Sequence, residues 1–254
     1  MKIGFFDSGL GGLTLLKAVR DLLPQYDYIY FGDTINLPYG SKSEDEIYKL
    51  AFHGIQKLFT MDAQLVIIAC NTVSAESLRR LQDTVFNRTH PERRVLGVII
   101  PTVEAVLETG ARDVLLIGTK RTIESNKYEY ELKKLTDTIR LQTLATPYLV
   151  PLIEEHKFDE AIYILRKDIE ERVGDVEALI LGCTHYTLLK DALRMIYPEV
   201  RIFSQDEIIP EKLKNYLLRH PEIESILTRT NALTILLSKE SERYHKIKKV
   251  FFGI

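Results

Sequence analysis

The chain contains two cysteines, and each follows an apolar run at the point where polar residues begin. The two segments read LVIIACNT (residues 65–72) and ALILGCTH (residues 178–185). A thiol with hydroxyl, amide or imidazole neighbours at the end of a strand can exchange a proton or act as a nucleophile. Because the same placement occurs twice, the pattern predicts that Cys70 and Cys183 face one substrate.

Three other uses of the cysteines are open. A cysteine after an apolar run is more commonly a small buried hydrophobic residue. A structural disulfide is less expected, because the N-terminus turns polar too early for a secretion signal and two cysteines make a weak framework for this length. Two thiols and one neighbouring imidazole also fall short of the usual spaced ligand sets for a metal. The sequence therefore predicts no metal site.

Two further side chains could assist the second thiol. A single histidine such as His185 is more often a buried structural or capping residue, and Glu154 in VPLIE (residues 150–154) could equally be a surface carboxylate at a helix start. An imidazole beside a thiol, oriented by a carboxylate, is nevertheless the arrangement that generates a thiolate or returns its proton.

The segment DSGLGG (residues 7–12) is rich in glycine but matches neither the dinucleotide-binding pattern nor a P-loop. It is either a tight strand-to-helix turn or a place where backbone amides approach a small anion at a helix N-terminus. Asp7 beside such an anion site is unfavourable unless it handles a proton or an ammonium group. An amino acid carries both charges, so it suits this segment as a ligand.

Several neutral polar residues have both a structural and a functional interpretation. The segment PYG (residues 38–40) is either a turn or a ligand contact through backbone N–H groups and the Tyr39 hydroxyl. Asn71, Thr72 and Thr184 either cap the helices that follow them or donate hydrogen bonds to substrate carboxylates.

Short apolar runs alternate with stretches of helical spacing along the chain. The runs are residues 3–6, 28–31, 65–69, 95–99, 114–117, 139–144, 178–181 and 200–203, and the helical stretches include residues 13–23, 44–59, 122–135 and 159–173. This alternation predicts parallel sheets covered by helices, and such sheets bind ligands at the carboxyl ends of their strands. The polar motifs above all fall at such ends.

We therefore expect an α/β fold of two doubly wound, mainly parallel-sheet domains related by pseudo-two-fold symmetry, with the site in the cleft between them. The first domain is predicted to comprise residues 1–97 and 207–254 and to carry Cys70. The second is predicted to comprise residues 98–206 and to carry Cys183. A return crossing near Asp206 would bring the last helices back to the first domain.

The composition is that of an ordinary globular protein, with 45% apolar and 28% charged residues among 254. Lys and Arg number 34 against 36 Asp and Glu, so the formal charge is −2 and no overall basic field would bind a nucleic-acid backbone. No apolar segment approaches the length that crosses a bilayer. We expect neither nucleic-acid nor membrane partners, a cytoplasmic location, and free thiols in its reducing environment.

Taken together, the motifs at residues 7–12, 38–40, 69–74, 118–119 and 182–186 closely resemble the signature of bacterial glutamate racemase. The resemblance runs in order from Asp7 to about Leu189. It implies interconversion of L- and D-glutamate without pyridoxal phosphate, metal or any other cofactor, supplying D-glutamate for peptidoglycan. The sequence differs from the residues usual in this family at Val73, at Thr187 and at Ser204-Gln205.

The resemblance also assigns roles to individual residues. Cys70 and Cys183 become the paired acid and base, with Cys70 handling the proton of D-glutamate and Cys183 that of L-glutamate. Asp7 assists Cys70, while His185 and Glu154 assist Cys183. The residues that match substrate-binding positions are Asp7, Ser8, Pro38, Tyr39, Gly40, Asn71, Thr72, Thr119, Thr184 and His185.

Two alternative functions stay open at this point. The substrate could be aspartate or another acidic amino acid, although aspartate racemases typically place an acidic residue where this chain has His185. The chain could also be a non-catalytic regulator, since some glutamate racemases bind and inhibit DNA gyrase. Glutamate is the expected small-molecule partner, and a homodimer is left open.

Overall fold

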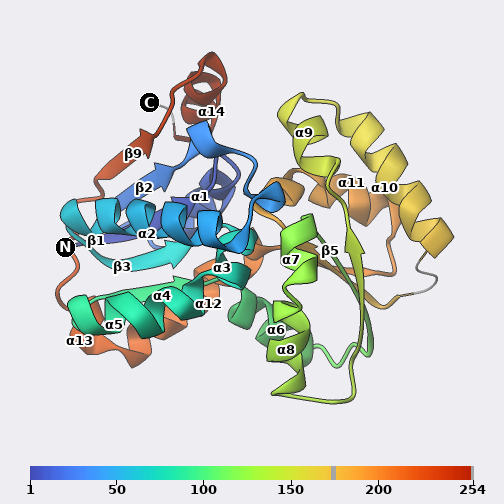
Figure 1. Cartoon of the computed structure of the whole chain (residues 1–254), viewed down its shortest axis with the longest axis horizontal. Helices are drawn as coiled ribbons and strands as arrows, with labels where there is room; N and C mark the ends of the chain where they lie inside the picture. Colours follow the sequence, from blue (N-terminus) through green and yellow to red (C-terminus); the bar gives the residue numbers. More distant parts are fainter. Residues whose placement is uncertain (173–175, 253–254) are drawn as a thin grey trace.

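The computed structural model describes residues 1–172 and 176–252, and it contains two all-parallel sheets flanked by helices (Figure 1). Sheet A has the strand order β4-β3-β1-β2-β9, and sheet B has the order β6-β5-β7-β8. The strands are β1 (Lys2–Asp7), β2 (Tyr28–Gly32), β3 (Ala63–Ile68), β4 (Arg94–Gly97), β5 (Asp113–Gly118), β6 (Arg140–Ala145), β7 (Ala178–Gly182), β8 (Arg201–Phe203) and β9 (Leu233–Leu237). The predicted fold class of two parallel-sheet α/β domains is confirmed.

The two sheets repeat one strand order. The order β2-β1-β3-β4 within sheet A corresponds to β6-β5-β7-β8 in sheet B. In this correspondence β3 matches β7. Cys70 comes two residues after the end of β3, and Cys183 comes directly after β7. The duplicated thiols of the sequence therefore stand at equivalent strand ends of two similarly built sheets.

The central strands of each sheet are buried on both faces, which explains their continuous apolar sequences. In sheet A, Phe5 and Tyr30 pack into one apolar cluster, while Phe6 and Ile29 on the alternate positions pack into another. Sheet B divides in the same way between two further clusters. Burial on both faces holds the strands rigidly, so their carboxyl ends can position side chains.

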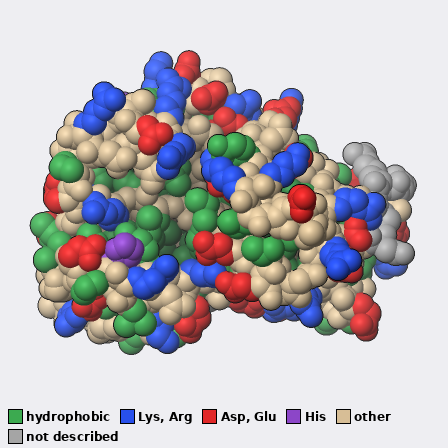
Figure 2. Space-filling model, turned by 90° about the horizontal axis from the view of Figure 1, so that it is seen from below, with side chains coloured by type: hydrophobic (Ala, Val, Ile, Leu, Met, Phe, Trp, Pro, Cys, Tyr) green, Lys and Arg blue, Asp and Glu red, His purple; other side chains and the backbone are tan. Residues whose placement is uncertain are grey.

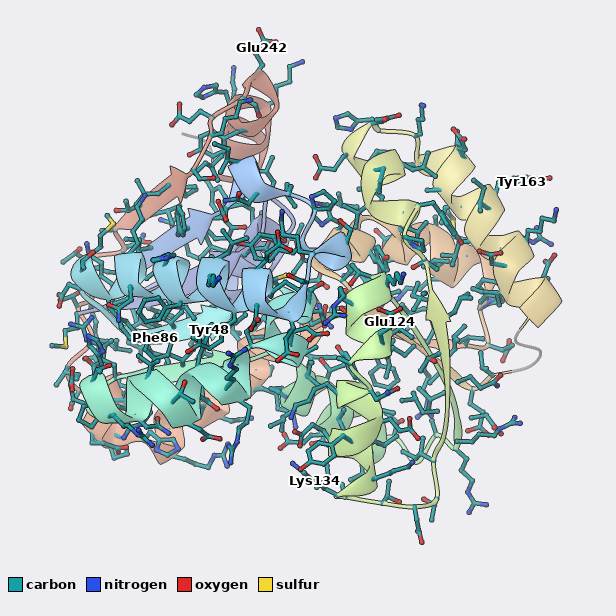
Figure 3. All side chains as sticks on the ribbon, viewed as in Figure 1. Tyr48, Phe86, Glu124, Lys134, Tyr163 and Glu242 are labelled. Atoms are coloured by element: carbon teal, nitrogen blue, oxygen red, sulfur yellow. The ribbon has the colours of Figure 1, made fainter. Side chains whose placement is uncertain are left out.

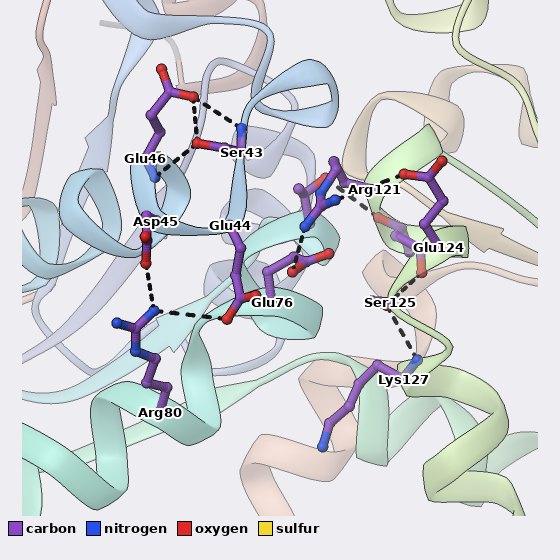
Figure 4. Close-up of polar contacts among 12 residues, drawn as sticks. Ser43, Glu44, Asp45, Glu46, Glu76, Arg80, Arg121, Glu124, Ser125 and Lys127 are labelled. Carbon is purple, nitrogen blue, oxygen red and sulfur yellow. Dashed lines mark hydrogen bonds and ion pairs between the residues drawn. The ribbon is translucent and has the colours of Figure 1, made fainter.

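Helix α2 (Glu44–Thr60) begins at a capping box of two reciprocal hydrogen bonds. The Ser43 hydroxyl accepts a bond from the Glu46 N–H while the Glu46 carboxylate accepts one from the Ser43 N–H (Figure 4). The other helices are α1 (Gly12–Leu22), α3 (Asn71–Glu76), α4 (Leu78–Leu81), α5 (Asn87–Thr89), α6 (Ile99–Glu108), α7 (Lys120–Glu124), α8 (Lys127–Lys133), α9 (Leu149–Glu154), α10 (Phe158–Arg172), α11 (Lys190–Ile196), α12 (Gln205–Arg219), α13 (Pro221–Glu224) and α14 (Glu242–Phe252). Short 3₁₀ turns occupy η1 (Thr34–Asn36), η2 (Tyr39–Ser41) and η4 (Thr184–Leu189), and a π-helical turn occupies η3 (Gln82–Phe86).

The structure corrects one predicted helix. The stretch predicted as a single helix over residues 122–135 is divided into α7 and α8, because Asn126 adopts a left-handed conformation with φ of 52°. The Ser125 hydroxyl accepts a hydrogen bond from the Lys127 N–H at 3.2 Å, which restarts the chain as α8. The predicted last residue of another helix, Val173, lies outside the described residues.

The sequence also missed strand β9. This half-buried strand pairs in parallel with β2 at the edge of sheet A. Asp27, just before β2, secures it: Asp27 Oδ1 accepts bonds from the Thr230 N–H and hydroxyl, both at 2.8 Å, and from the Ala232 N–H at 3.1 Å. Burial alone would raise the pKa of Asp27, but hydrogen bonds from Thr228, Ala232 and Thr230 lower it to about 2.

Helix α12 carries the chain from sheet B back to sheet A. Ile209, Leu213 and Leu217 on this helix join the apolar cluster formed by α1 and sheet A, and α12 also contacts α6. The predicted domain limits, residues 1–97 with 207–254 and residues 98–206, stay a prediction.

An ion pair joins the two domains near the site. Arg121 on α7 lies 3.0 Å from the buried carboxylate of Glu76 on α3 (Figure 4). Burial raises the pKa of Glu76, while the Arg121 charge lowers it. Because Glu76 belongs to the helix that starts after Cys70, this pair ties the first thiol's helix to the second domain.

Lys, Arg, Asp and Glu side chains are interspersed over the face in Figure 2, and Tyr163 on α10 is an exposed aromatic residue at the outer edge of the molecule in Figure 3. Within the described residues, no helix combines the length and apolar character needed to cross a bilayer.

The hydrogen bonds of Asp27 predict that removing its carboxylate lowers the stability of the fold. Replacing Asp27 with alanine should lower the free energy of unfolding by about 1–3 kcal/mol, because it removes three hydrogen bonds that a buried carboxylate accepts from the segment before β9. Its folded pKa of about 2 lies below the ordinary 3.8, so the carboxylate stabilises the fold above about pH 4 and this contribution is lost as pH falls toward 2. Urea unfolding at several pH values measures both effects. Asp21→Ala, on an exposed helix face, is the control, and equal stability of the two variants at pH 7 would contradict the role of Asp27.

Candidate active site

A cavity of about 120 Å³ lies where the carboxyl ends of the two sheets face each other. All predicted site residues line it except Asp7 and Glu154, which lie behind the lining. The sequence analysis missed other lining residues, namely Leu37, Ser41, Lys120, Pro147, Val150 and Pro151. Apart from Lys120 these residues carry no charged group that could have singled them out. A small molecule placed here would meet both thiols.

Backbone N–H groups of the glycine-rich segment bind the side-chain carboxylate of Asp7, which belongs to the same segment. Asp7 is fully buried, and its Oδ2 accepts hydrogen bonds from the N–H groups of Gly9 at 3.2 Å and Gly12 at 3.0 Å. A Cβ on Gly12 would lie 2.8 Å from the Asp7 Cβ, so only glycine allows this approach. The N–H groups of Gly9 and Gly12 are therefore used by Asp7, and an approach of the other amides of this segment to a ligand anion stays a prediction.

Asp7 is also connected to the second domain. The Thr184 hydroxyl, directly after Cys183, donates a hydrogen bond to Asp7 Oδ1 at 3.4 Å. Burial raises the pKa of Asp7, while the charge of His185 and the N–H groups of the loop lower it. Asp7 thus acts on Cys70 through its charge and is hydrogen-bonded to the residue that follows Cys183.

Cys70 is held in its protonated form. Its thiol is buried and donates to the Ser8 hydroxyl at 3.5 Å. Burial and the negative charge of Asp7 raise the pKa of Cys70 to about 12, against smaller opposing effects of Ser8 and the Val73 N–H. At neutral pH the Cys70 side chain is therefore a proton donor.

Cys183 has the opposite surroundings. The His185 Nδ1 lies 3.8 Å from the Cys183 sulfur, and the His185 Nε2 lies 2.6 Å from a carboxylate oxygen of Glu154. Burial alone would lower the pKa of His185, but its contacts with Cys183 and Glu154 raise it to about 10. The His185 ring is thus positioned to exchange a proton with the Cys183 side chain. Glu154 is the last residue of α9 rather than the start of a helix.

The loop of residues 37–41 closes one side of the cavity. The Tyr39 hydroxyl donates to Asp33 Oδ2 at 2.7 Å, so its hydrogen is already used and only its oxygen can accept from a ligand. A Cβ on Gly40 would lie 2.7 Å from the Cβ of Thr119, which belongs to the other domain. Glycine at position 40 is thus required for the two domains to meet beside the cavity.

A cluster of three threonine hydroxyls crosses the domain junction. The Thr72 hydroxyl lies 3.0 Å from that of Thr119 and 3.3 Å from that of Thr122, and the latter two are 3.0 Å apart. Thr122 was missed by the sequence analysis, although its spacing of three from Thr119 places both on one helix face. Thr119 caps α7, whereas the side chains of Asn71 and Thr72 make no cap bond. The capping interpretation therefore fails for these two residues.

Nothing in the described part of the chain resembles a metal centre, since no three His, Cys, Asp or Glu side chains converge there. The reaction without metal or cofactor stays a prediction. The chemistry available to the side chains is proton transfer: a buried thiol and a thiol beside an imidazolium face one small cavity.

Known proteins resemble this chain over nearly its whole length. A profile of the Asp/Glu/Hydantoin racemase family matches residues 14–204. The glutamate racemase of Jannaschia sp. is 37% identical over 239 residues, covering 88% of this chain and 87% of that protein. The glutamate racemase of Roseobacter denitrificans is 36% identical over 236 residues, covering 87% of each chain. The solved glutamate racemase of Francisella tularensis in complex with D-glutamate matches with a TM-score of 0.86 at 29% identity, covering 100% of this chain and 94% of that one.

The different surroundings of the two thiols predict selective alkylation. At pH 8 iodoacetamide should modify Cys183 at least about tenfold faster than Cys70, because only the thiolate reacts and Cys70 has a pKa of about 12. Peptide mass spectrometry over a time course measures the two rates. In a His185→Gln variant the preference should shrink, and equal rates in the unmodified protein would contradict this assignment.

Proposed function

The chain belongs to the Asp/Glu/Hydantoin racemase family, and we propose that it interconverts L- and D-glutamate by moving the Cα proton between Cys70 and Cys183. The resemblance of its motifs to this family is confirmed, and with it an isomerase activity of the racemase type. The use of the two cysteines and the choice of glutamate are the proposal.

The observation that supports the proposal most directly is the position of the two thiols. Cys70 and Cys183 follow equivalent strands of two different sheets and line one cavity. Inverting a carbon centre needs a base on one face of Cα and an acid on the other. Two thiols that come from opposing domains supply that geometry without any movement of the substrate.

The proposed reaction starts from a thiolate on Cys183 and a thiol on Cys70. The Cys183 sulfur removes the Cα proton of L-glutamate, and the electron pair left on Cα takes up the proton of Cys70 from the opposite face. D-Glutamate leaves a thiol on Cys183 and a thiolate on Cys70, and the reverse reaction restores the first state. The atoms and charges balance without an oxidant or reductant.

The supporting residues stabilise these states. His185, held by Glu154, lies beside the Cys183 sulfur, and its positive charge stabilises negative charge on that sulfur. The buried carboxylate of Asp7 favours the protonated form of Cys70 and holds Thr184. The Cα proton is far less acidic than a thiol, so oriented dipoles must stabilise the carbanionic transition state, each 1.36 kcal/mol giving about tenfold in rate.

Neutral groups surround the substrate in this proposal. Ser8, Asn71, Thr72 and Thr119 offer hydroxyl and amide groups that can donate to the two carboxylates of glutamate. The loop of residues 38–40 adds backbone N–H groups. The product D-glutamate would supply peptidoglycan synthesis, and the reaction would take place in the cytoplasm.

The first test follows the substrate's optical activity. L-Glutamate incubated with reduced protein in D₂O, with a chelator and no added cofactor, should lose its circular dichroism signal completely. Mass spectrometry should then find one deuterium at Cα, because the returning proton comes from a thiol that exchanges with solvent. A signal that stays constant with folded protein would overturn glutamate as substrate. L-Aspartate under the same conditions would then test the other acidic amino acid, and a search for gyrase inhibition would test a binding role.

The second test separates the two thiols. Cys70→Ser and Cys183→Ser should each lower kcat by about 10²–10⁴, because a hydroxyl is a much weaker acid and a poorer base than a thiol. Both variants should keep the circular dichroism spectrum of the folded protein. Racemisation at the unmodified rate by either variant would contradict the two-thiol reaction while leaving a racemase activity intact.

A further inference from the structure

A buried polar network lies directly behind Asn71, one of the cavity residues. It joins Asn71 at the start of α3, Tyr128 on α8 and Gln205 at the start of α12. All three side chains are at most 2% exposed, and only Asn71 lines the cavity. Helices α3 and α12 meet near the middle of the molecule in Figure 1, and α8 contacts α3 there. The network therefore connects the cavity wall to both domains.

The hydrogen bonds of this network fix which way the Asn71 amide points. Its Oδ1 accepts from the Tyr128 hydroxyl at 2.7 Å and from the Gln205 Nε2 at 3.3 Å, so both acceptor positions are filled. Its Nδ2 donates to the Gln205 Oε1 at 3.4 Å. The second N–H of Asn71 has no partner elsewhere in the described part of the chain.

The Gln205 amide is fixed in the same way. Besides its bond to Asn71, the Gln205 Nε2 donates to the Tyr128 oxygen at 3.3 Å. The Tyr128 hydroxyl uses its own hydrogen toward Asn71 Oδ1. A flip of the Asn71 amide alone would set its NH₂ group against the Gln205 Nε2 and its oxygen against the Gln205 Oε1, so the Gln205 amide opposes that flip.

The orientation matters because an asparagine side chain can present either an acceptor or a donor. An Oδ1 facing the cavity would repel the oxygens of a carboxylate, whereas an N–H would bind them. Resting on the proposed function, we propose that Tyr128 and Gln205 are positioning residues that hold the Asn71 amide with its free N–H toward the cavity, where it binds a carboxylate of the substrate.

The test removes one hydroxyl from the network. In Tyr128→Phe, KM for both enantiomers of glutamate should rise about fivefold while kcat changes less than about twofold, because the lost bond weakens ground state and transition state alike. Tyr28→Phe is the control, since that hydroxyl is equally buried but donates to the Leu23 carbonyl away from the cavity. The control should leave KM unchanged even if it lowers the melting temperature.

A double variant separates positioning from general structural damage. If Tyr128 acts through Asn71, Tyr128→Phe should add no further rise in KM to an Asn71→Ala protein. The same rise in both backgrounds, or an unchanged KM in the single variant, would overturn the proposal.

A second measurement keeps this inference separate from the identity of the substrate. The side-chain ¹⁵N–¹H amide signals of Asn71, assigned by their absence in Asn71→Ala, should exchange with solvent at least about tenfold faster in Tyr128→Phe than in the unmodified protein. Equal exchange would contradict the network's role whatever the substrate. Faster exchange in a protein that never racemises glutamate would support the fixed amide and overturn only the proposed function.

Discussion

In the proposed reaction two chemically identical side chains invert one carbon centre, so they must differ in protonation, and the contacts of His185 distinguish them. Although burial lowers the pKa of His185, its contacts with Cys183 and with the Glu154 carboxylate at 2.6 Å raise it to about 10, so a positive charge lies beside Cys183. No comparable cation contacts Cys70 among the described residues, and burial together with the nearby carboxylate of Asp7 raises its pKa. In the proposed reaction from L-glutamate, Cys183 therefore starts as the base and Cys70 as the acid.

This difference depends on burial, and burial depends on how the two domains meet. Thr184 reaches Asp7, Thr119 contacts the loop at Gly40, and Arg121 pairs with Glu76, so each contact crosses the junction. If the domains moved apart, water would enter the cavity and screen the charges that distinguish the thiols. The paired strand ends place the sulfur atoms, but the contacts across the junction maintain the electrostatic environment in which they differ.

The sequence predicted the repeated elements better than the contacts between them. Eight strands could be found because each coincides with an apolar run, and the site residues could be found because they follow those runs. Strand β9 was missed although its sequence LTILL is also apolar, because its pairing at the edge of sheet A is secured by Asp27 from far away in the sequence. The division between α7 and α8 depends on one left-handed residue, Asn126. The occupation of the loop amides by Asp7 was equally invisible, because spacing alone does not show which carboxylate a glycine-rich turn will bind.

The choice of neutral groups around the cavity follows from the same electrostatics. A lysine or arginine in contact with the substrate would bind a carboxylate strongly, but in a buried site it would also lower the pKa of both thiols and reduce the difference between them. The one lysine of the lining, Lys120, has a largely exposed side chain that pairs with Glu124. Hydroxyl and amide donors bind carboxylates without adding a net charge, but they must be oriented beforehand because each contributes little. Networks such as the threonine cluster and the bonds behind Asn71 supply that orientation, so fixed dipoles can replace a lysine or arginine in contact with the substrate.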